Sequence, residues 1–200
     1  ATLQRKAPAE HAVLQLVKRK TRPNNPQAVL DIIDQFAWNT QWLTNIGDHK
    51  GAILDSAIQQ HQPKQLPSDG KLYSMDPDET HVQLAKQMID HAGVSHKVEL
   101  SRAPCKHQQS KGVQKVDFVF LDHVEHLYKQ DLQYLMSSGF LTEGAVVVAD
   151  NVLYPGAPDY RAYVANSKAF ATQEHLTLVQ YSKTMQDIVT VSEYLSPEDA

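Results

Sequence analysis

Two nearly continuous runs of apolar residues stand out along the chain, at residues 116–121 and 145–149. Runs of this kind are typical of parallel strands that are buried on both faces of a sheet. Two further strand-like runs, at 176–181 and 188–194, are separated by only a short connection. That spacing predicts an antiparallel pair at the edge of the sheet.

Between these runs the apolar residues recur at helical spacing. The most regular example extends from Val82 to Ala92, with Pro77 placed to start the helix and Gly93 placed to end it. Strands that alternate with helices indicate an α/β protein with a doubly wound, mostly parallel sheet and an antiparallel last strand. The helices and remaining strands are expected at residues 12–17, 29–42, 52–61, 71–75, 97–100, 127–136 and 159–170.

Composition narrows the class of protein. A length of 200 residues with 42% hydrophobic content suits a single domain over residues 1–200. The formal net charge is -4, and the basic residues do not cluster into the positive face that nucleic acid binding requires. Nucleic acid is therefore not expected as a partner. The only cysteine, Cys105, excludes an internal disulfide and favours a cytoplasmic location. No apolar run has the length of a membrane span, and we expect a monomer.

Acidic residues follow both of the long apolar runs. Asp122 comes directly after the first run, and Asp150 and Asn151 come after the second. In an open α/β sheet, ligands bind outside the carboxyl ends of the strands, so these side chains should converge. Carboxylate and amide oxygens suit Mg²⁺. The alternative is that each aspartate only caps the helix that follows it.

Three segments carry a more specific resemblance: residues 42–48 (WLTNIGD), 120–123 (FLDH) and 149–159 (ADNVLYPGAPD). In this order they resemble the signature segments of the catechol O-methyltransferase family. The resemblance implies a Rossmann-like methyltransferase fold, S-adenosylmethionine (SAM) as cofactor, Mg²⁺, and a catechol-like small molecule as substrate. It also implies that Asp122, Asp150 and Asn151 hold the metal.

The same resemblance assigns further residues by position. Asp76 falls where the family binds the ribose of SAM, although it could equally cap the helix after Pro77. His123 aligns with a cofactor-adjacent histidine, although a lone histidine is often structural, and Trp42 could belong to the core instead of the substrate pocket. The remaining positions align with cofactor contacts at Asn45, Ile46, Cys105, Lys106 and Asp122, and with substrate contacts at Trp42, Thr44, Asn151, Pro155 and Gln180.

The chain departs from the family at the catalytic base. Glu125 stands where the family has a lysine, and a carboxylate is a weak base for a phenol. Glu125 could instead form an ion pair with Lys129 one helical turn later. Gln180 also replaces a glutamate that faces the catechol. Two alternatives therefore remain open: a catalytically degenerate methyltransferase-like binding protein, or an O-methyltransferase for a different phenol or diol.

A second departure is an absent segment. Between Gln65 and Leu72 the family has a buried strand, a glycine-rich turn and most of a helix that cradle SAM, whereas only a short segment around 66–71 is present here. A shorter stretch is also absent after Lys106. Loss of a central strand would leave two unpaired strand edges. We therefore expect the whole protein to contain residues at these two places that the printed sequence lacks.

Overall fold

The computed structural model describes residues 8–61, 70–102 and 115–195 of the chain. The chain divides into two compact units, of which the first contains residues 1–44 and 68–108 and the second contains residues 45–67 and 109–200. Each unit is described by itself. The expected single domain over residues 1–200 stays a prediction.

The first unit combines three helices with a short parallel sheet. Helix α1 (Ala9–Lys20) packs against α2 (Pro26–Asn39) and α4 (Glu79–Ala92). Strand β1 (Leu72–Met75) pairs in parallel with β2 (Val98–Ser101), and the 3₁₀ turn η1 (Ser95–Lys97) precedes β2. Among the described residues β1 pairs with no strand other than β2, and the residues at its two ends, Leu72 and Met75, are exposed.

The two ends of α4 are set by local side-chain and backbone chemistry. Asp78 is the N-cap, because its carboxylate accepts a hydrogen bond from the Thr80 amide at 2.7 Å. The alternative that Asp76 caps this helix is therefore wrong, and the helix starts two residues after Pro77. Gly93 ends it in the left-handed conformation, with φ of 79°, as expected.

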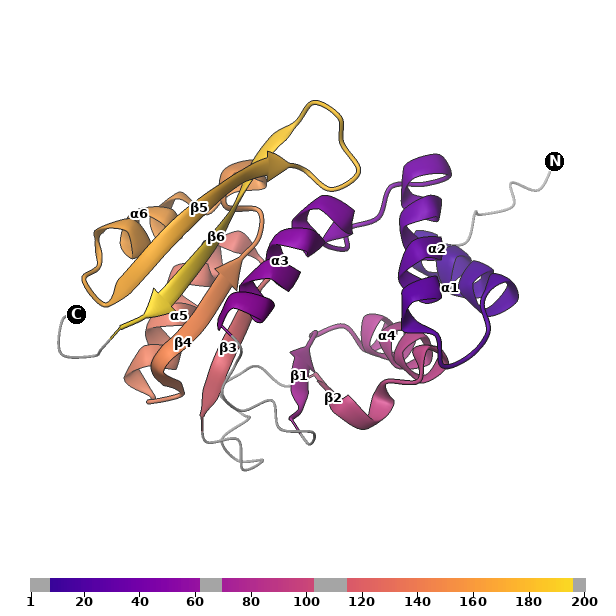
Figure 1. The fold of residues 1–200 in the computed structure, drawn as a ribbon, viewed down its shortest axis with the longest axis horizontal. Coiled ribbons are helices and arrows are strands. Elements are labelled where there is room, and N and C mark those ends of the chain that lie inside the picture. Colours follow the sequence, from indigo (N-terminus) through magenta and orange to yellow (C-terminus); the bar gives the residue numbers. More distant parts are fainter. Residues whose placement is uncertain (1–7, 62–69, 103–114, 196–200) are drawn as a thin grey trace. The chain divides into compact units, whose positions relative to one another are not determined.

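The second unit is built on a four-stranded sheet with the strand order β3-β4-β6-β5. Strands β3 and β4 are parallel, whereas β6 is antiparallel to both β4 and β5, and β5 lies at the edge. Helix α3 covers one face of the sheet and helices α5 and α6 cover the other (Figure 1). The bounds are α3 (Gly47–His61), β3 (Val116–Leu121), η4 (Glu125–Leu127), α5 (Tyr128–Ser137), β4 (Leu141–Ala149), η5 (Val152–Gly156), α6 (Pro158–Asn166), β5 (Phe170–Leu178) and β6 (Gln186–Tyr194).

One core cluster of the second unit lies between α3 and the sheet. Ala57 of α3 contacts the valine side chains of β4 and β6, and Ile53 and Leu54 pack on the same cluster. Strand β4 is buried on both faces, as expected from its apolar run, because Val147 and Val148 are both 0% exposed and point to opposite faces. Strand β3 is only half-buried along most of its length. Its outer edge has no partner strand among the described residues.

Several element boundaries differ from the sequence expectation: α2 ends at Asn39 instead of Trp42, and the edge strand β5 occupies Phe170–Leu178 instead of residues 176–181. Helix α3 begins at Gly47, five residues before the expected start, so residues 45–48, which the sequence predicts as a turn, include the start of this helix. Asp48 favours this start, because an acidic residue in the first turn interacts well with the helix dipole. Phe170 begins β5 instead of ending α6, and its ring packs 5.4 Å from that of Tyr194 on β6.

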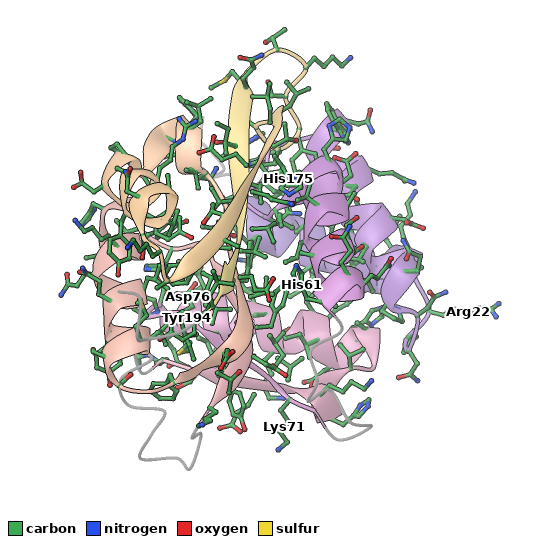
Figure 2. The ribbon with its side chains drawn as sticks, turned by 60° about the vertical axis from the view of Figure 1, so that its left-hand side comes forward. Arg22, His61, Lys71, Asp76, His175 and Tyr194 are labelled. Carbon is green, nitrogen blue, oxygen red and sulfur yellow. The ribbon has the colours of Figure 1, made fainter. Side chains whose placement is uncertain are left out.

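The side chains of Arg22 and Lys71 extend away from the ribbon (Figure 2). Within the described ranges, no helix is both long and apolar enough to cross a membrane.

Replacing Gly93 by alanine tests the C-terminal cap of α4. A left-handed alanine costs about 1–2 kcal/mol, and an added Cβ would lie 2.9 Å from the Asn24 Cα. Gly139→Ala is the matched control, since Gly139 has φ of 71° but no atom within 4 Å of an added Cβ. Denaturant unfolding should show a larger loss for Gly93→Ala than for the control, and equal losses would contradict the close contact.

Candidate functional site

The carboxyl ends of β3 and β4 lie side by side in the second unit. Leu121 and Ala149 are register partners, and the Asp150 amide donates to the Leu121 carbonyl at 3.0 Å. Neighbouring strands are about 4.8 Å apart, so Asp122 and Asp150 leave the sheet as neighbours. The structure thereby brings together the two acidic residues that the sequence placed at the strand ends.

The turn after β4 fixes the orientation of the Asn151 side chain. Asn151 has a left-handed backbone with φ of 56°, and its Nδ2 donates to the Tyr154 carbonyl at 3.0 Å and to Asp187 Oδ2 at 3.2 Å. An amide nitrogen has two hydrogens, and both face acceptors here. The amide oxygen, Oδ1, is therefore presented as an acceptor for another group.

A buried lysine lies beside Asp150. Lys50, in the first turn of α3, is 0% exposed, and its Nζ lies 2.8 Å from Asp150 Oδ1 and 2.6 Å from Asp187 Oδ2. It also donates to Gln180 Oε1 at 3.1 Å. An isolated buried ammonium would be strongly destabilising, whereas this one has an acceptor for each of its three hydrogens. The ammonium therefore connects α3, the end of β4, β6 and the segment before β6.

Asp187 stabilises the turn after β4 through hydrogen bonds. Its Oδ1 accepts hydrogen bonds from the backbone amides of Leu153, Tyr154 and Ile188 at 3.1, 2.9 and 2.8 Å. Its Oδ2 accepts from Lys50 and Asn151. These five donors occupy both oxygens, so this completely buried carboxylate holds the turn after β4 and is not presented to a ligand.

Asp122 has an unusual electrostatic environment. Its pKa is raised to about 7, first because surrounding protein displaces water from the carboxyl group, and second because of the negative charge of Asp150. Glu125 adds to this effect, and Lys50 opposes it. Burial likewise raises the pKa of Asp150, although the hydrogen bond from Lys50 opposes the shift. The strand ends therefore carry more negative charge than Lys50 compensates.

Among the described residues, no group of three or more His, Cys, Asp or Glu side chains is arranged to hold a metal ion. The predicted set contains only two carboxylates, Asp122 and Asp150, and takes its third oxygen from the amide of Asn151. Any metal at this place would therefore depend on the fixed orientation of that amide.

Tyr128 extends the site below the strand ends. Its side chain is 0% exposed, and its hydroxyl has no hydrogen-bond partner among the described residues. The ring lies 4.9 Å from that of His123 and 5.7 Å from that of Tyr160. His123 itself lies 2.8 Å from Asp131 on α5. These contacts are compatible with a structural role of His123, and its predicted cofactor contact stays a prediction.

Asn45 and Ile46 precede α3 and are both half-buried. Asn45 Nδ2 donates to the Tyr181 hydroxyl at 2.7 Å, while Oδ1 is buried with no partner among the described residues. An unsatisfied buried acceptor is costly, so this oxygen is suited to a ligand that donates a hydrogen bond. Gly47 allows the close approach of this segment to Gln180, since an added Cβ would lie 2.9 Å from the Gln180 Cβ.

Several other predicted residues belong to the first unit or lie outside the described residues. Asp76 follows β1, and its two oxygens lie 2.8 Å from the Asp78 amide and 3.2 Å from His81 Nδ1. Trp42 is 50% exposed, which contradicts the alternative that it belongs to the core. Thr44 is also exposed. Cys105, Lys106 and most of the 66–71 segment lie outside the described residues, as do the two places where residues were expected to be absent.

Glu125 begins the short helix η4 and lies close enough to Asp122 to raise its pKa. The alternative ion pair with Lys129 does not form, because Lys129 Nζ instead stands 5.8 Å from the centre of the Tyr163 ring. Pro155 is exposed and follows a cis peptide bond from Tyr154. Glu125 and Pro155 are therefore at least partly exposed, and a ligand can reach them.

Known proteins share this arrangement of elements and sequence. A family model described as O-methyltransferase matches residues 37–191. A probable O-methyltransferase of Mycobacterium tuberculosis is 33% identical over 216 residues, which cover 93% of this chain and 92% of that protein. The chain belongs to the O-methyltransferase family. Catechol O-methyltransferase of Mus musculus is 30% identical over 202 residues, which cover 90% of this chain and 76% of that protein.

Solved structures support the fold of this family member. A putative O-methyltransferase from Klebsiella pneumoniae superposes with a TM-score of 0.62 at 16% identity, covering 97% of this chain and 93% of that one. The O-methyltransferase TomG from Streptomyces achromogenes, solved with SAM, gives a TM-score of 0.57 at 17% identity, covering 98% and 93%. The expected Rossmann-like methyltransferase fold is thus confirmed.

Three residues of this O-methyltransferase family site were missed from the sequence. Lys50 lies at helical spacing from Leu54 and Ala57, so a longer helix would have placed a lysine on the apolar face and shown that it needed a buried partner. Asp187 directly precedes an apolar strand and gives a similar signal. Tyr128 has no such signal, because an aromatic residue at the start of a helix is commonly core.

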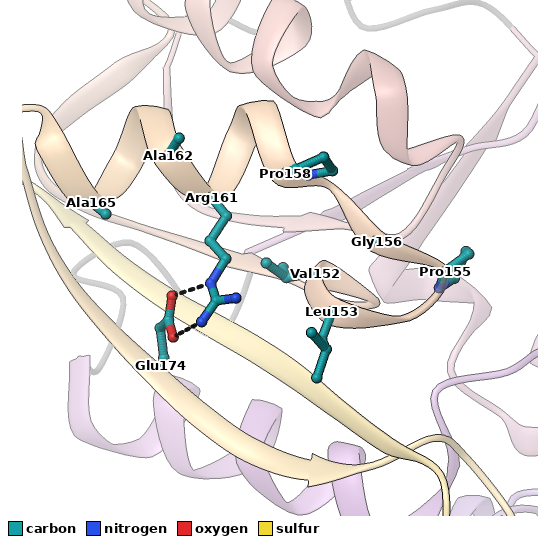
Figure 3. A pocket seen from close by; sticks show the side chains of 9 residues that line it. All are labelled: Val152, Leu153, Pro155, Gly156, Pro158, Arg161, Ala162, Ala165 and Glu174. Carbon is teal, nitrogen blue, oxygen red and sulfur yellow. Dashed lines mark hydrogen bonds and ion pairs between the residues drawn. The ribbon is translucent and has the colours of Figure 1, made fainter.

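A cavity of about 500 Å³ lies between the turn after β4, helix α6 and strand β5 (Figure 3). Its floor carries the ion pair of Arg161 and Glu174, whose two bonds are each 2.6 Å long. Pro155 also lines the cavity, whereas none of the predicted metal ligands does. Its lining residues are Val152, Leu153, Pro155, Gly156, Pro158, Arg161, Ala162, Ala165 and Glu174.

Replacing Tyr128 by phenylalanine should stabilise the ligand-free protein. The change removes a buried hydroxyl without a partner, and such a group costs about 1–3 kcal/mol. Tyr160→Phe is the matched control, because the Tyr160 hydroxyl accepts a hydrogen bond from Thr190. Thermal unfolding should show a higher midpoint for Tyr128→Phe and a lower one for Tyr160→Phe. A lower midpoint for both variants would mean that the Tyr128 hydroxyl is satisfied.

The ion pair in the cavity should make stability depend on acid pH. Two hydrogen bonds from Arg161 lower the pKa of Glu174 below its ordinary value of 4.5. The pair therefore contributes stability above that value, and the contribution is lost as the pH falls through the lower pKa of the folded state. For a partly exposed pair we expect a loss of about 0.5 kcal/mol at pH 6 in Glu174→Gln.

Below the lowered pKa, Glu174→Gln and the wild type should unfold alike. Glu143→Gln, at an exposed position of β4, serves as the control for the loss of a surface carboxylate. Unfolding measured from pH 6 to pH 3 checks the prediction, and a constant difference between Glu174→Gln and the wild type would refute it.

Proposed function

We propose that the protein transfers a methyl group from SAM to one hydroxyl of a catechol-like small molecule, with Mg²⁺ held by Asp122, Asp150 and Asn151. The arrangement at the ends of β3 and β4 carries this proposal. Family membership supports O-methyl transfer, and the relatives include a protein named for catechol. The cofactor follows from the SAM-bound relative of the same fold.

The donor set fits a hard divalent cation. Asp150 uses Oδ1 for both of its hydrogen bonds, to Lys50 and to the Asn151 amide, so its Oδ2 can accept a ligand. Asn151 contributes an oriented amide oxygen, and Asp122 adds a carboxylate whose charge is uncompensated. A cation bound here would relieve the repulsion between the two carboxylates, and it would favour the deprotonated form of a phenol.

The residues before α3 fit a cofactor that donates hydrogen bonds. The unpartnered Oδ1 of Asn45 suits an ammonium or hydroxyl donor, and SAM carries both kinds of group. Asp76 remains the proposed ribose contact, and Ile46 and His123 the proposed neighbours of the cofactor. A bound SAM would supply the methyl group: the substrate oxygen would bond to the methyl carbon while the methyl–sulfur bond breaks and leaves its electron pair on sulfur.

The protein has two tasks in such a reaction. It must hold the substrate oxygen in line with the methyl group, for which Trp42, Thr44, Pro155 and Gln180 are the proposed contacts. It must also accept the phenol proton, for which Glu125 is the candidate in place of the family lysine. With a reference pKa of about 4.3, a glutamate depends on prior weakening of the O–H bond. We therefore expect catalysis to depend on the metal more than on Glu125.

Methyl transfer to a panel of catechols and simple phenols tests the proposed function. The wild type should methylate a catechol with Mg²⁺ and lose activity in a chelator. Asp150→Asn should lower kcat by at least about a hundredfold, because it removes a ligand charge while retaining an acceptor for Lys50. Asp159→Asn, at an exposed site in the first turn of α6, should leave kcat unchanged.

Other outcomes identify the alternatives. Activity on non-catechol phenols alone would replace the substrate, as the change from glutamate to Gln180 suggests. Binding of SAM without turnover of any acceptor would favour the catalytically degenerate binding protein. Activity that is indifferent to chelator would remove Mg²⁺ from the proposal.

A further inference from the structure

Lys50 is a cation that already occupies the acidic strand ends. Its Nζ has three acceptors, on Asp150, Asp187 and Gln180, at 2.8, 2.6 and 3.1 Å. An ammonium has three hydrogens, so the group is fully satisfied without solvent. With all its hydrogens bound and no exposed surface, Lys50 holds a fixed position relative to Asp150.

The lysine does not neutralise its surroundings. One ammonium faces two buried carboxylates, those of Asp150 and Asp187, and Asp122 adds a third acidic group nearby. The cluster therefore attracts a further cation even though Lys50 is present. The effect of Lys50 on such a cation is then geometric as well as electrostatic.

The geometric effect concerns the two oxygens of Asp150. Oδ1 accepts hydrogen bonds from Lys50 at 2.8 Å and from the Asn151 amide at 2.7 Å. No described residue donates to Oδ2, so Asp150 offers a ligand one oxygen instead of two. Asp187 offers none, because both of its oxygens are already occupied.

We propose that Lys50 determines which divalent cation this site prefers, by restricting Asp150 to coordination through a single oxygen. Mg²⁺ binds six ligands in a strict octahedron and accepts single carboxylate oxygens and waters. Ca²⁺ takes up to eight ligands and often binds both oxygens of a carboxylate. A lysine bound to Oδ1 therefore disfavours Ca²⁺ more than Mg²⁺. This inference rests on the metal site of the proposed function.

Calorimetric titration with MgCl₂ and with CaCl₂, without SAM or substrate, tests the inference. Lys50→Met removes the ammonium and leaves Asp150 Oδ1 with one hydrogen bond, from the Asn151 amide, so that its second lone pair can reach a cation. Loss of a positive charge should strengthen the binding of both cations, so the informative quantity is the ratio of the two Kd values. We expect the Kd for Ca²⁺ relative to that for Mg²⁺ to fall about tenfold.

A second variant separates the effect of Lys50 on coordination geometry from the effect of its charge. It also keeps the inference testable if Lys50→Met fails to fold. Lys50→Met alone leaves two buried carboxylates without their cation, which is strongly destabilising. The double variant Lys50→Met/Asp187→Asn has the same net charge in this cluster as the wild type and likewise removes the ammonium from Oδ1. The ratio should fall in the double variant as well. Lys86→Met, which removes an exposed lysine of α4, should leave the ratio unchanged.

The outcomes distinguish this inference from the proposed function. If the wild type binds Mg²⁺ and the folded double variant keeps the wild-type ratio, the role of Lys50 is refuted while the metal site stands. A ratio that falls in Lys50→Met but not in the double variant also refutes it, because charge alone would then explain the change. If the wild type binds neither cation, the proposed metal site itself is wrong.

Discussion

The site depends on one buried ammonium group. Lys50 could not remain charged inside the second unit without compensation, since the transfer of an isolated charge from water to a protein interior is strongly unfavourable. Two carboxylates and an amide oxygen meet it from three different segments. Helix α3 is thereby tied to the ends of β4 and β6 by directional bonds as well as by the apolar contacts of Ala57.

The Lys50 ammonium also fixes the turn that follows β4, through Asp187. Lys50 holds Asp187, and Asp187 in turn accepts the backbone amides of Leu153 and Tyr154. The same carboxylate accepts one hydrogen of the Asn151 side chain, which sets the direction of the amide oxygen. A ligand at the strand ends therefore meets atoms that are oriented by bonds made below them, in the interior of the sheet. Preorganisation of this kind reduces the cost of arranging ligand atoms when a ligand binds.

The sequence was most informative where a single pattern determines the outcome. An apolar run followed by an acidic residue was enough to place Asp122 and Asp150 at neighbouring strand ends. Lys50 could not be placed because its role depends on where α3 begins, and the Asn45–Gly47 segment had been interpreted as a turn before a later helix. The partners of a buried charge also come from distant segments, here more than 130 positions away in the case of Asp187, and periodicity carries no information about such pairs.

The sheet was only partly predictable for a different reason. Strands β3 and β4 have similar apolar sequences, yet only β4 is flanked on both sides by strands. Burial of a strand depends on its neighbours as well as on its own residues, so the same pattern gives a fully buried strand in one place and a half-buried one in the other.

The charges at the strand ends restrict what can bind there. The negative charges of Glu125 and Asp150 act on Asp122, and among the described residues Lys50 supplies the positive charge that opposes them. A neutral or anionic ligand would add nothing to offset this negative charge, whereas a cationic ligand would lower the electrostatic energy of the folded protein. Both groups required by the proposed reaction, a divalent cation and a sulfonium, are positively charged. The replacement of a lysine by Glu125 strengthens this preference, because it exchanges a competing cation for another carboxylate. The same exchange makes an anionic substrate oxygen unfavourable unless positive charge is bound beside it, so a bound cation would favour the proposed reaction.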